Sequence, residues 1–283
     1  MNYTEFLYNT AKKNNSIICF GMDPVLEKIP LKGSIYKRIY SFYETILTRM
    51  IQKNVLPGAV KPNYAFYAQY GFQGIKALEK IITLFQSEFL PVILDAKRGD
   101  IGSTAEAYAI EAFSFFHADA VTLAPYMGYD SIKPFVSKYP GKGYYILTKT
   151  SNKSSCEIQD LISGGITIHE HVAKKIIEWY HPGIGSVVGA TFPEQLAKIN
   201  SIFGSSGKKI PLLIPGIGSQ GGSIIEILRT ISHNEDTYIH RINSSSALNF
   251  AYQDKPGAHY ADASVNALSE LNNEIEVILN GNK

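Results

Sequence analysis

The chain is poor in cysteine, and this scarcity excludes two classes of protein. Its 283 residues include only Cys19 and Cys156, in unrelated sequence contexts. They form neither a disulfide framework nor a CxxC metal motif. Such cysteine usage is typical of a reducing cytosol, and we interpret both thiols as buried or idle.

The chain also lacks any long apolar run. The opening MNYTEFLYNTAKKNN has no continuous hydrophobic segment of the signal-peptide kind. No later segment approaches the roughly 18 apolar residues of a membrane span. We therefore expect a soluble, cytoplasmic protein with no membrane partner. A Pro/Gly/Ser-rich linker is missing too, which favours a single domain over residues 1–283.

Charge of one sign is not in excess. Lysine and arginine total 27 and aspartate and glutamate 25, a formal net charge of +2, and the basic residues are scattered. The 18 tyrosines form no recognisable stacking platform for bases. These features predict no nucleic-acid partner and favour a small-molecule ligand, which can be anionic.

The sequence does contain a regular alternation of short apolar runs and segments with helical periodicity. Eight apolar runs alternating with helical segments in this length predict an α/β fold, a single closed (β/α)8 TIM barrel rather than an open doubly wound sheet. The runs cover residues 16–21, 58–62, 91–97, 118–125, 143–149, 186–191, 210–216 and 238–244. The helical segments cover 36–51, 74–85, 104–116, 168–180, 193–203, 223–231 and 258–279.

Barrels of this class build their active sites from the C-terminal ends of the strands and the loops that follow. We therefore expect the polar residues at those ends to lie together around the mouth of the barrel, although each of them alone could be an ordinary polar residue of a strand end or loop. They are Asp23, Lys61, Asp95, Lys97, Ser151, Gln220 and Ser244 to Ser246.

The third strand ends in a concentration of charge, within VILDAKRGDIGSTAEAYA at residues 92–109. Because side chains alternate along a strand, Asp95 and Lys97 face the same side, where Lys61 of the neighbouring strand can join them. Such an array tolerates burial and keeps a lysine protonated beside carboxylates, which suits a general acid. A structural ion-pair network is the alternative.

Asp100 lies beyond this strand, before a helix that we expect Ser103 and Glu106 to begin as an S-x-x-E capping box. Its side chain is placed to face away from its own barrel. A carboxylate in that position can serve a second subunit, so we predict active sites completed across a dimer axis.

The segment IPGIGSQGG, residues 214–222, is rich in glycine. Its backbone N–H groups can approach a phosphate near the helix that begins around Ser223. Gln220 could bridge the phosphate and a base when the loop closes, and phosphate binding energy could then position the reacting groups. Standing alone, a glycine-rich turn is more often only a turn.

These motifs, together with FGMDP, VKPNYAFYAQYG and TKTSN, resemble the orotidine 5'-phosphate decarboxylase family in its longer, type 2 subgroup. The resemblance runs in order from about residue 17 to the final helix. It implies a metal- and cofactor-independent decarboxylation of orotidine 5'-monophosphate to uridine 5'-monophosphate in de novo pyrimidine biosynthesis. It also implies a homodimer with shared active sites.

The resemblance further implies a role for individual residues. Lys61, Asp95, Lys97 and Asp100 would form a charged tetrad, in which Lys97 stabilises the carbanion and protonates C6 of the pyrimidine and Asp95 lies by the departing carboxylate. Asp100 and Thr104 would come from the partner subunit. Asp23 and Lys61 would hold ribose hydroxyls and Ser151 the pyrimidine amide edge. The remaining substrate-binding positions implied are Pro215, Gln220, Gly221 and Ser246.

Two positions depart from the family pattern. Where the family usually has an arginine that grips the phosphate, INSSSALNF has Ser246. A hydroxyl can donate one hydrogen bond but not the bidentate charged contact. Arg241 lies on the preceding strand, and we do not expect it to substitute. Ala124 stands where the subgroup generally carries an asparagine.

Two other functions remain open at this point. A magnesium-dependent sugar-phosphate decarboxylase or synthase of the same barrel superfamily also uses a DxKxxD element, although Lys61 and Gln220 favour the metal-free enzyme. The second alternative is a non-catalytic nucleotide-binding protein that kept the tetrad but lost phosphate affinity through Ser246.

Overall fold

The computed structural model describes residues 1–217, 221–232 and 235–281 and contains an eight-stranded parallel sheet. Its strand order is β2-β1-β10-β9-β8-β5-β4-β3, and parallel bridges Val60–Val92 and Asn63–Asp95 join the two outer strands. The sheet therefore closes, which confirms the predicted (β/α)8 barrel. The strands are β1 (Ile18–Met22), β2 (Ala59–Pro62), β3 (Ile93–Arg98), β4 (Ala120–Leu123), β5 (Gly143–Lys149), β8 (Ile184–Val188), β9 (Leu212–Pro215) and β10 (Arg241–Ser244).

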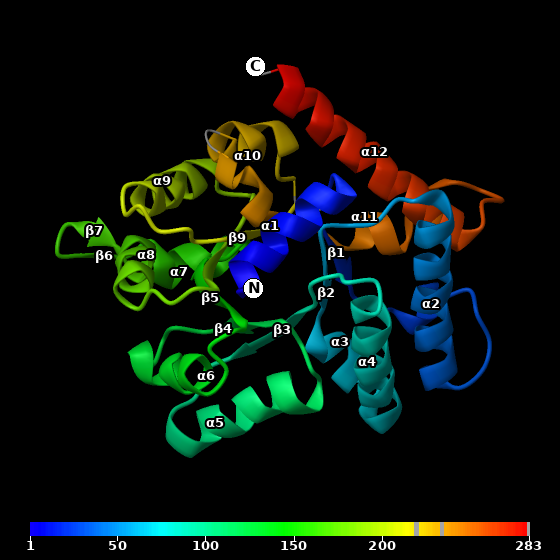
Figure 1. Ribbon diagram of the computed structural model, residues 1–283, viewed down its shortest axis with the longest axis horizontal. Coiled ribbons are helices and arrows are strands. Elements are labelled where there is room, and N and C mark those ends of the chain that lie inside the picture. The colour runs from blue at the N-terminus through cyan, green and yellow to red at the C-terminus, as the bar shows by residue number, and fades with distance from the viewer. Residues whose placement is uncertain (218–220, 233–234, 282–283) are drawn as a thin grey trace.

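Seven helices lie on the seven segments predicted from periodicity and surround the strands as a ring (Figure 1). They are α2 (Ile35–Lys53), α4 (Gly71–Gln86), α5 (Gly102–Ile110), α8 (Ile168–Glu178), α9 (Pro193–Gly204), α10 (Ile224–Ile231) and α12 (Tyr260–Gly281). Periodicity did not predict the short elements α3 (Tyr64–Ala68), α6 (Lys133–Lys138), α7 (Cys156–Gln159) and α11 (Ser246–Asn249), or the hairpin of β6 (Ile162–Ser163) and β7 (Ile166–Thr167).

The helix α1 (Tyr3–Asn14) was also not predicted, and it closes one end of the barrel. A capping box between Asn2 and Glu5 begins it, and it crosses the centre of the barrel in Figure 1. Tyr3 and Leu7 pack on an interior layer of side chains, so a ligand has to approach from the opposite end, where the strands finish. That layer comprises Cys19, Ala59, Ile93, Ala120, Tyr145, Val187 and Leu213.

Arg241 on β10 is fully buried at this closed end. Its guanidinium donates to the carbonyl oxygens of Leu7, Gly58, Tyr238 and His240 at 2.5 to 3.1 Å. These hydrogen bonds satisfy the buried guanidinium, as a buried charge requires. They also connect α1 to the barrel. Arg241 therefore does not replace the missing phosphate-gripping arginine, in agreement with the sequence prediction.

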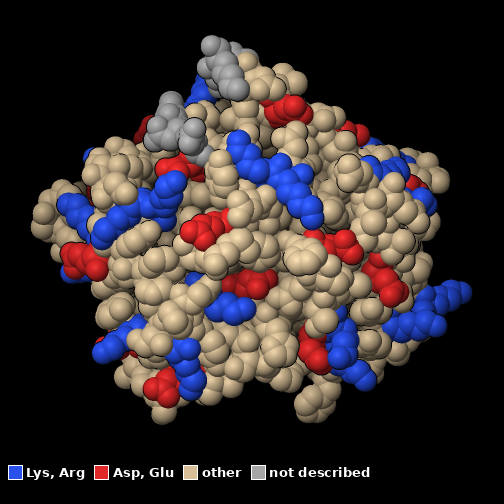
Figure 2. Space-filling model, viewed as in Figure 1, with Lys and Arg blue, Asp and Glu red and all other residues tan. Residues whose placement is uncertain are grey.

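The surface carries mixed charge. On the face shown in Figure 2, acidic and basic side chains are interspersed and form no large patch of one sign. This distribution agrees with the net charge of +2. Within the described residues, no helix is both long enough and apolar enough to cross a membrane.

Candidate active site

The alternation of the strands places a second interior layer above the one that contacts α1. Two residues beyond Ala59, Ile93 and Ala120, the strands β2, β3 and β4 carry Lys61, Asp95 and Thr122. All three are at most 8% exposed. A polar cluster therefore replaces an apolar layer at the depth where the barrel opens, as predicted for Lys61 and Asp95.

Asp95 is the centre of this cluster. Its Oδ2 accepts from Lys61 Nζ at 2.8 Å, and its Oδ1 accepts from Lys97 Nζ at 2.6 Å and from Thr122 Oγ1 at 3.0 Å. The side chains of Lys61 and Asp95 are 6% and 9% exposed, whereas that of Lys97 is 49% exposed. A buried carboxylate thus holds one buried ammonium and one that reaches the open mouth.

The buried pair stays charged. Burial alone would lower the pKa of the Lys61 ammonium, but the carboxylates of Asp95 and Asp23 outweigh it and raise that pKa. Burial alone would raise the pKa of Asp95, but Lys61 and Lys97 outweigh it and hold that pKa well below its ordinary value. Asp95 is therefore an anion throughout the physiological pH range.

This lowered pKa predicts how stability depends on pH. An aspartate whose pKa in the folded protein lies below its unfolded pKa of about 3.9 stabilises the fold above pH 3.9. This contribution to stability is lost as the pH falls toward the folded-state pKa. We expect Asp95→Asn to make the free energy of unfolding fall less steeply from about pH 5 to pH 2, measured by urea unfolding. Asp262→Asn, at a 31% exposed carboxylate paired with Lys53, should change the slope less. Equal slopes for Asp95→Asn and wild type would contradict the pairing.

Lys97 has an unusual backbone. Its φ is +46°, in the left-handed region that non-glycine residues seldom adopt. From Leu94 to Arg98 β3 advances four residues, while β4 advances only two, from Val121 to Leu123. The resulting bulge lifts Lys97 from the regular strand and directs its ammonium back to Asp95.

Asp100 does not join the other three charges within one subunit. Its Oδ1 accepts from the N–H of Ile101 at 2.8 Å, and no ion pair found among the described residues includes it. Thr104 is exposed in the first turn of α5. Asp100 is partly buried and Thr104 is exposed, and their contribution to a partner's site stays a prediction.

The predicted capping box at the start of α5 is wrong. The helix begins at Gly102, the N-cap is Ile101, and Ile101 makes no side-chain capping bond. Gly102, with φ of +54°, starts the helix one residue before Ser103. Ser103 therefore lies inside the first turn, where its hydroxyl is not in the capping position.

Asp23 follows β1 at the mouth. Its Oδ1 is buried and has no hydrogen-bond partner within the described structure. A buried, unpaired acceptor is costly unless a ligand satisfies it. Asp23 Oδ1 is therefore free to accept a hydrogen bond from a ligand hydroxyl, and its contact with ribose stays a prediction.

Ser151 lies just beyond β5, and its backbone packs against Gly189 at the end of β8. A Cβ at Gly189 would come within 2.7 Å of the Ser151 Cα. Thr191 Oγ1 donates to the Ser151 carbonyl oxygen at 3.0 Å. At the base of the same loop, the fully buried ammonium of Lys149 pairs with Asp160 at 2.7 Å. These contacts hold Ser151 at the rim of the mouth.

The glycine-rich loop begins at Pro215, the last residue of β9. Gly222 N–H donates to the Gly216 carbonyl oxygen at 3.0 Å, and Gly216 and Gly221 have φ of +107° and +85°. Ser223 caps α10 by accepting from the N–H of Glu226. The described ends of this segment, residues 215–217 and 221–223, are therefore hydrogen-bonded to each other, and α10 begins directly after Ser223, close to the predicted start. Gln220 lies outside the described residues.

The two departures from the family pattern lie at the mouth. Ser246 is the first residue of α11 and is exposed. Ala124 follows β4, is partly buried, and its N–H donates to the Arg98 carbonyl oxygen at 2.7 Å. Neither position carries a cationic side chain toward a phosphate.

Two residues of this layer were missed by the sequence reasoning. Thr122 contacts both Asp95 and Lys97, with its Oγ1 accepting from the Lys97 N–H at 2.9 Å. Asn243, two residues beyond Arg241 on β10, is 7% exposed, and its buried Oδ1 has no partner in the described structure. The sequence signal that could have identified Thr122 and Asn243 is a polar residue in an otherwise apolar strand, two positions after a residue that points into the barrel.

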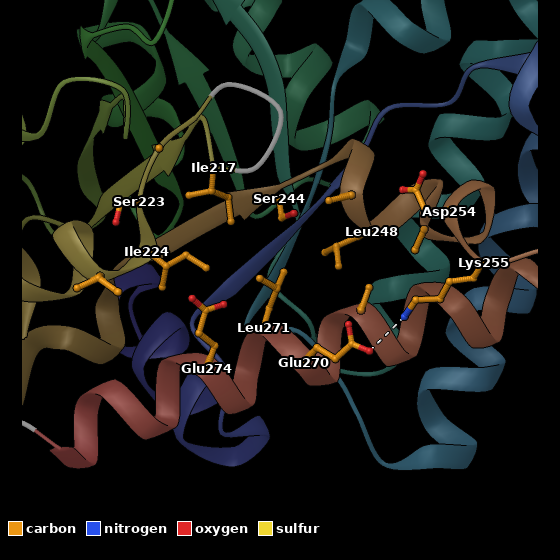
Figure 3. A pocket seen from close by; sticks show the side chains of 15 residues that line it. Ile217, Ser223, Ile224, Ser244, Leu248, Asp254, Lys255, Glu270, Leu271 and Glu274 are labelled. Atoms are coloured by element: carbon orange, nitrogen blue, oxygen red, sulfur yellow. Dashed lines mark hydrogen bonds and ion pairs between the residues drawn. The ribbon is translucent and has the colours of Figure 1, made fainter.

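A cavity of about 590 Å³ lies between α10, α11 and α12 rather than at the charged cluster. Figure 3 shows Ile224, Leu248 and Leu271 around it, with Lys255 paired to Glu270 at 3.1 Å. Gly222 and Ser244 also line it, but Lys61, Asp95 and Lys97 do not. The cavity thus borders the glycine-rich loop and lies apart from the reactive groups.

The barrel and its mouth define the class of (β/α)8-barrel enzymes that place a lysine–aspartate–lysine cluster at the strand ends. The family model described as "Orotidine 5'-phosphate decarboxylase / HUMPS family" matches residues 53–239. The chain belongs to this family, which confirms the resemblance seen in the motifs.

Individual relatives agree over most of the chain. Orotidine 5'-phosphate decarboxylases from Cupriavidus necator and Dechloromonas aromatica are 40% and 42% identical to it, and each match covers 90% of this chain and 92% of the relative. The solved structure of Leishmania donovani OMP decarboxylase matches with a TM-score of 0.79 at 32% identity, over 99% of both chains. The similarity thus includes the whole barrel.

Proposed function

We propose that this chain decarboxylates orotidine 5'-monophosphate to uridine 5'-monophosphate in pyrimidine biosynthesis, with residues 1–283 acting as one catalytic domain. The observation that carries the proposal is the carboxylate of Asp95 held between Lys61 and Lys97 at 2.8 and 2.6 Å. Family membership and relatives at about 40% identity support the same reaction.

In the proposed reaction the bond between C6 and the carboxylate breaks, carbon dioxide leaves and the electron pair remains on C6. Lys97 is the group placed to respond, because its ammonium is half exposed at the mouth. It stabilises the developing negative charge and then donates the Nζ proton to C6. Asp95 disfavours a second carboxylate beside it, and this repulsion falls as carbon dioxide departs.

The proposal requires no metal or cofactor, which separates it from the magnesium-dependent alternative. We expect the ultraviolet absorbance of orotidine 5'-monophosphate to change on addition of the protein at the same rate with and without EDTA. Loss of turnover in EDTA, restored by magnesium, would favour the alternative. Binding without turnover would indicate a nucleotide-binding protein.

We also propose that the active unit is a homodimer in which Asp100 and Thr104 serve the partner's site. Ile101, Tyr126 and Met127 support this interface, since they are 52%, 89% and 51% exposed in the loops after β3 and β4. Exposed apolar groups gathered near one site are typical of protein interfaces. No nucleic-acid or membrane partner is part of the proposal.

The missing arginine predicts a weak phosphate contact that can be repaired. We expect Ser246→Arg to lower the KM for orotidine 5'-monophosphate by at least about 10-fold, because a charge-assisted contact is worth about 1.5–3 kcal/mol. Position 246 is exposed, so the longer side chain need not be buried. Initial rates over a substrate series measure the effect, and Ser246→Gln, similar in length but neutral, is the control. An unchanged KM for Ser246→Arg would show that phosphate is not bound beside α11.

A further inference from the structure

Thr122 occupies the one β4 position opposite the bulge that carries Lys97. It lies between Val121 and Leu123, the residues that pair with Leu94 and Arg98 on either side of the register shift. Its side chain is buried, with 1% of the residue exposed. The residue is therefore fixed in place against the part of β3 that departs from regular geometry.

The hydroxyl of Thr122 makes two different hydrogen bonds there. It accepts from the Lys97 backbone N–H at 2.9 Å and donates to Asp95 Oδ1 at 3.0 Å. A hydroxyl has one donor and two acceptor positions, so both bonds form together. Asp95 Oδ1 in turn accepts from Lys97 Nζ at 2.6 Å. Thr122 thus closes a ring that includes both the backbone and the ammonium of Lys97.

This ring acts on a strained residue. The left-handed φ of +46° at Lys97 is sparsely populated and persists only where the surroundings determine it. On the C-terminal side, Arg98 forms a bidentate pair with Glu111 and stacks over the Tyr64 and Tyr108 rings at 4.6 and 4.4 Å. On the N-terminal side, the restraint on the Lys97 N–H is the Thr122 hydroxyl.

We propose that Thr122 is a positioning residue that sets the conformation of Lys97 and the orientation of the Asp95 carboxylate for proton transfer. It acts through these two residues and does not itself touch the reacting atoms. The inference rests on the proposed role of Lys97. A displacement of about 1 Å at a reacting group can cost on the order of 100-fold in rate, so the effect should appear in kcat.

The test compares Thr122→Val, which keeps the shape and removes the hydroxyl, with Thr122→Ser, which keeps the hydroxyl. We expect Thr122→Val to lower kcat by roughly 30- to 100-fold and Thr122→Ser to remain within about 3-fold of wild type. The Kd for uridine 5'-monophosphate, measured by calorimetry, should change less than 3-fold in both variants. In a crystal structure of Thr122→Val, Lys97 should leave the left-handed region.

Thr148→Val is the matched control. Thr148 on β5 is also a buried strand threonine, 2% exposed, but its hydroxyl bonds to Ser186 and Ile146 rather than to the charged cluster. It should leave kcat within about 2-fold of wild type. If Thr122→Val fails to fold, Thr122→Ala removes the same hydroxyl.

The proposal is overturned if Thr122→Val keeps kcat within 3-fold of wild type. It is also overturned if Thr122→Ser loses as much activity as Thr122→Val. Failure of the proposed function would appear differently. Wild-type protein would then bind uridine 5'-monophosphate but not turn over substrate, whatever residue stands at position 122.

Discussion

Replacing Lys97 by alanine is expected to reduce decarboxylation by at least about 10⁴-fold. General acid catalysis contributes roughly 10²- to 10⁴-fold and one electrostatic contact at the developing charge about 10²- to 10³-fold, and Lys97 is placed to supply both. Its ammonium, 2.6 Å from Asp95, is the half-exposed member of the pair of lysines that this carboxylate holds. The loss should appear in kcat, followed by ultraviolet absorbance at saturating substrate, while uridine 5'-monophosphate still binds.

Lys80→Ala is the control for this experiment. The Lys80 side chain is 47% exposed and paired with Glu79, which closely matches the 49% exposure of Lys97, but it lies on α4 away from the mouth. It should retain wild-type activity. If Lys97→Ala retained activity within 10-fold of wild type, Lys97 would not be the proton donor, and the buried Lys61 would be the next candidate.

The barrel could be predicted from the sequence because each strand and helix has its own local signal. All eight apolar runs became strands, and the seven periodic segments became helices. The helix α1 was missed although Asn2 and Glu5 gave a capping signal and Tyr3, Leu7 and Ala11 recur at helical spacing. Its packing under the barrel depends on residues from several strands that are far apart in the sequence, which no local pattern reveals.

The site was predictable only as far as strand alternation reaches. Alternation correctly predicted that Asp95 lies beside Lys61 of β2 and that Lys97 joins them, but Lys97 reaches Asp95 through the bulge in β3 and not through regular alternation. The left-handed backbone of Lys97 could not be predicted, since it arises from a register shift against β4 that the sequence of β3 does not encode alone. Thr122 was missed for the same reason. A threonine inside an apolar strand is ordinary until the bulge opposite it is known.

The position of Asp100 leads to the second large effect, recovery of activity from two inactive proteins. Lys97→Ala and Asp100→Ala are each expected to be inactive as homodimers. If Asp100 serves the partner's site, a hybrid dimer contains one site with Lys61, Asp95 and Lys97 from one subunit and an intact Asp100 from the other. Equal mixing with free exchange makes half of the dimers hybrids, each with one intact site of two, so activity should recover to about a quarter of wild type. Absorbance assays on the mixture, with mass spectrometry of differently tagged subunits, measure both activity and exchange.

Mixing Lys97→Ala with Asp95→Ala gives the control that isolates the sharing. Asp95 and Lys97 are ion-paired within one subunit at 2.6 Å, so every site in that hybrid lacks one of them and no activity should return. Recovery in the first mixture and none in the second requires Asp100 to act across the interface. If verified hybrids of Lys97→Ala and Asp100→Ala stay inactive, Asp100 acts in its own subunit. Its carboxylate would then have to leave the Ile101 N–H, 2.8 Å away, and turn toward its own mouth.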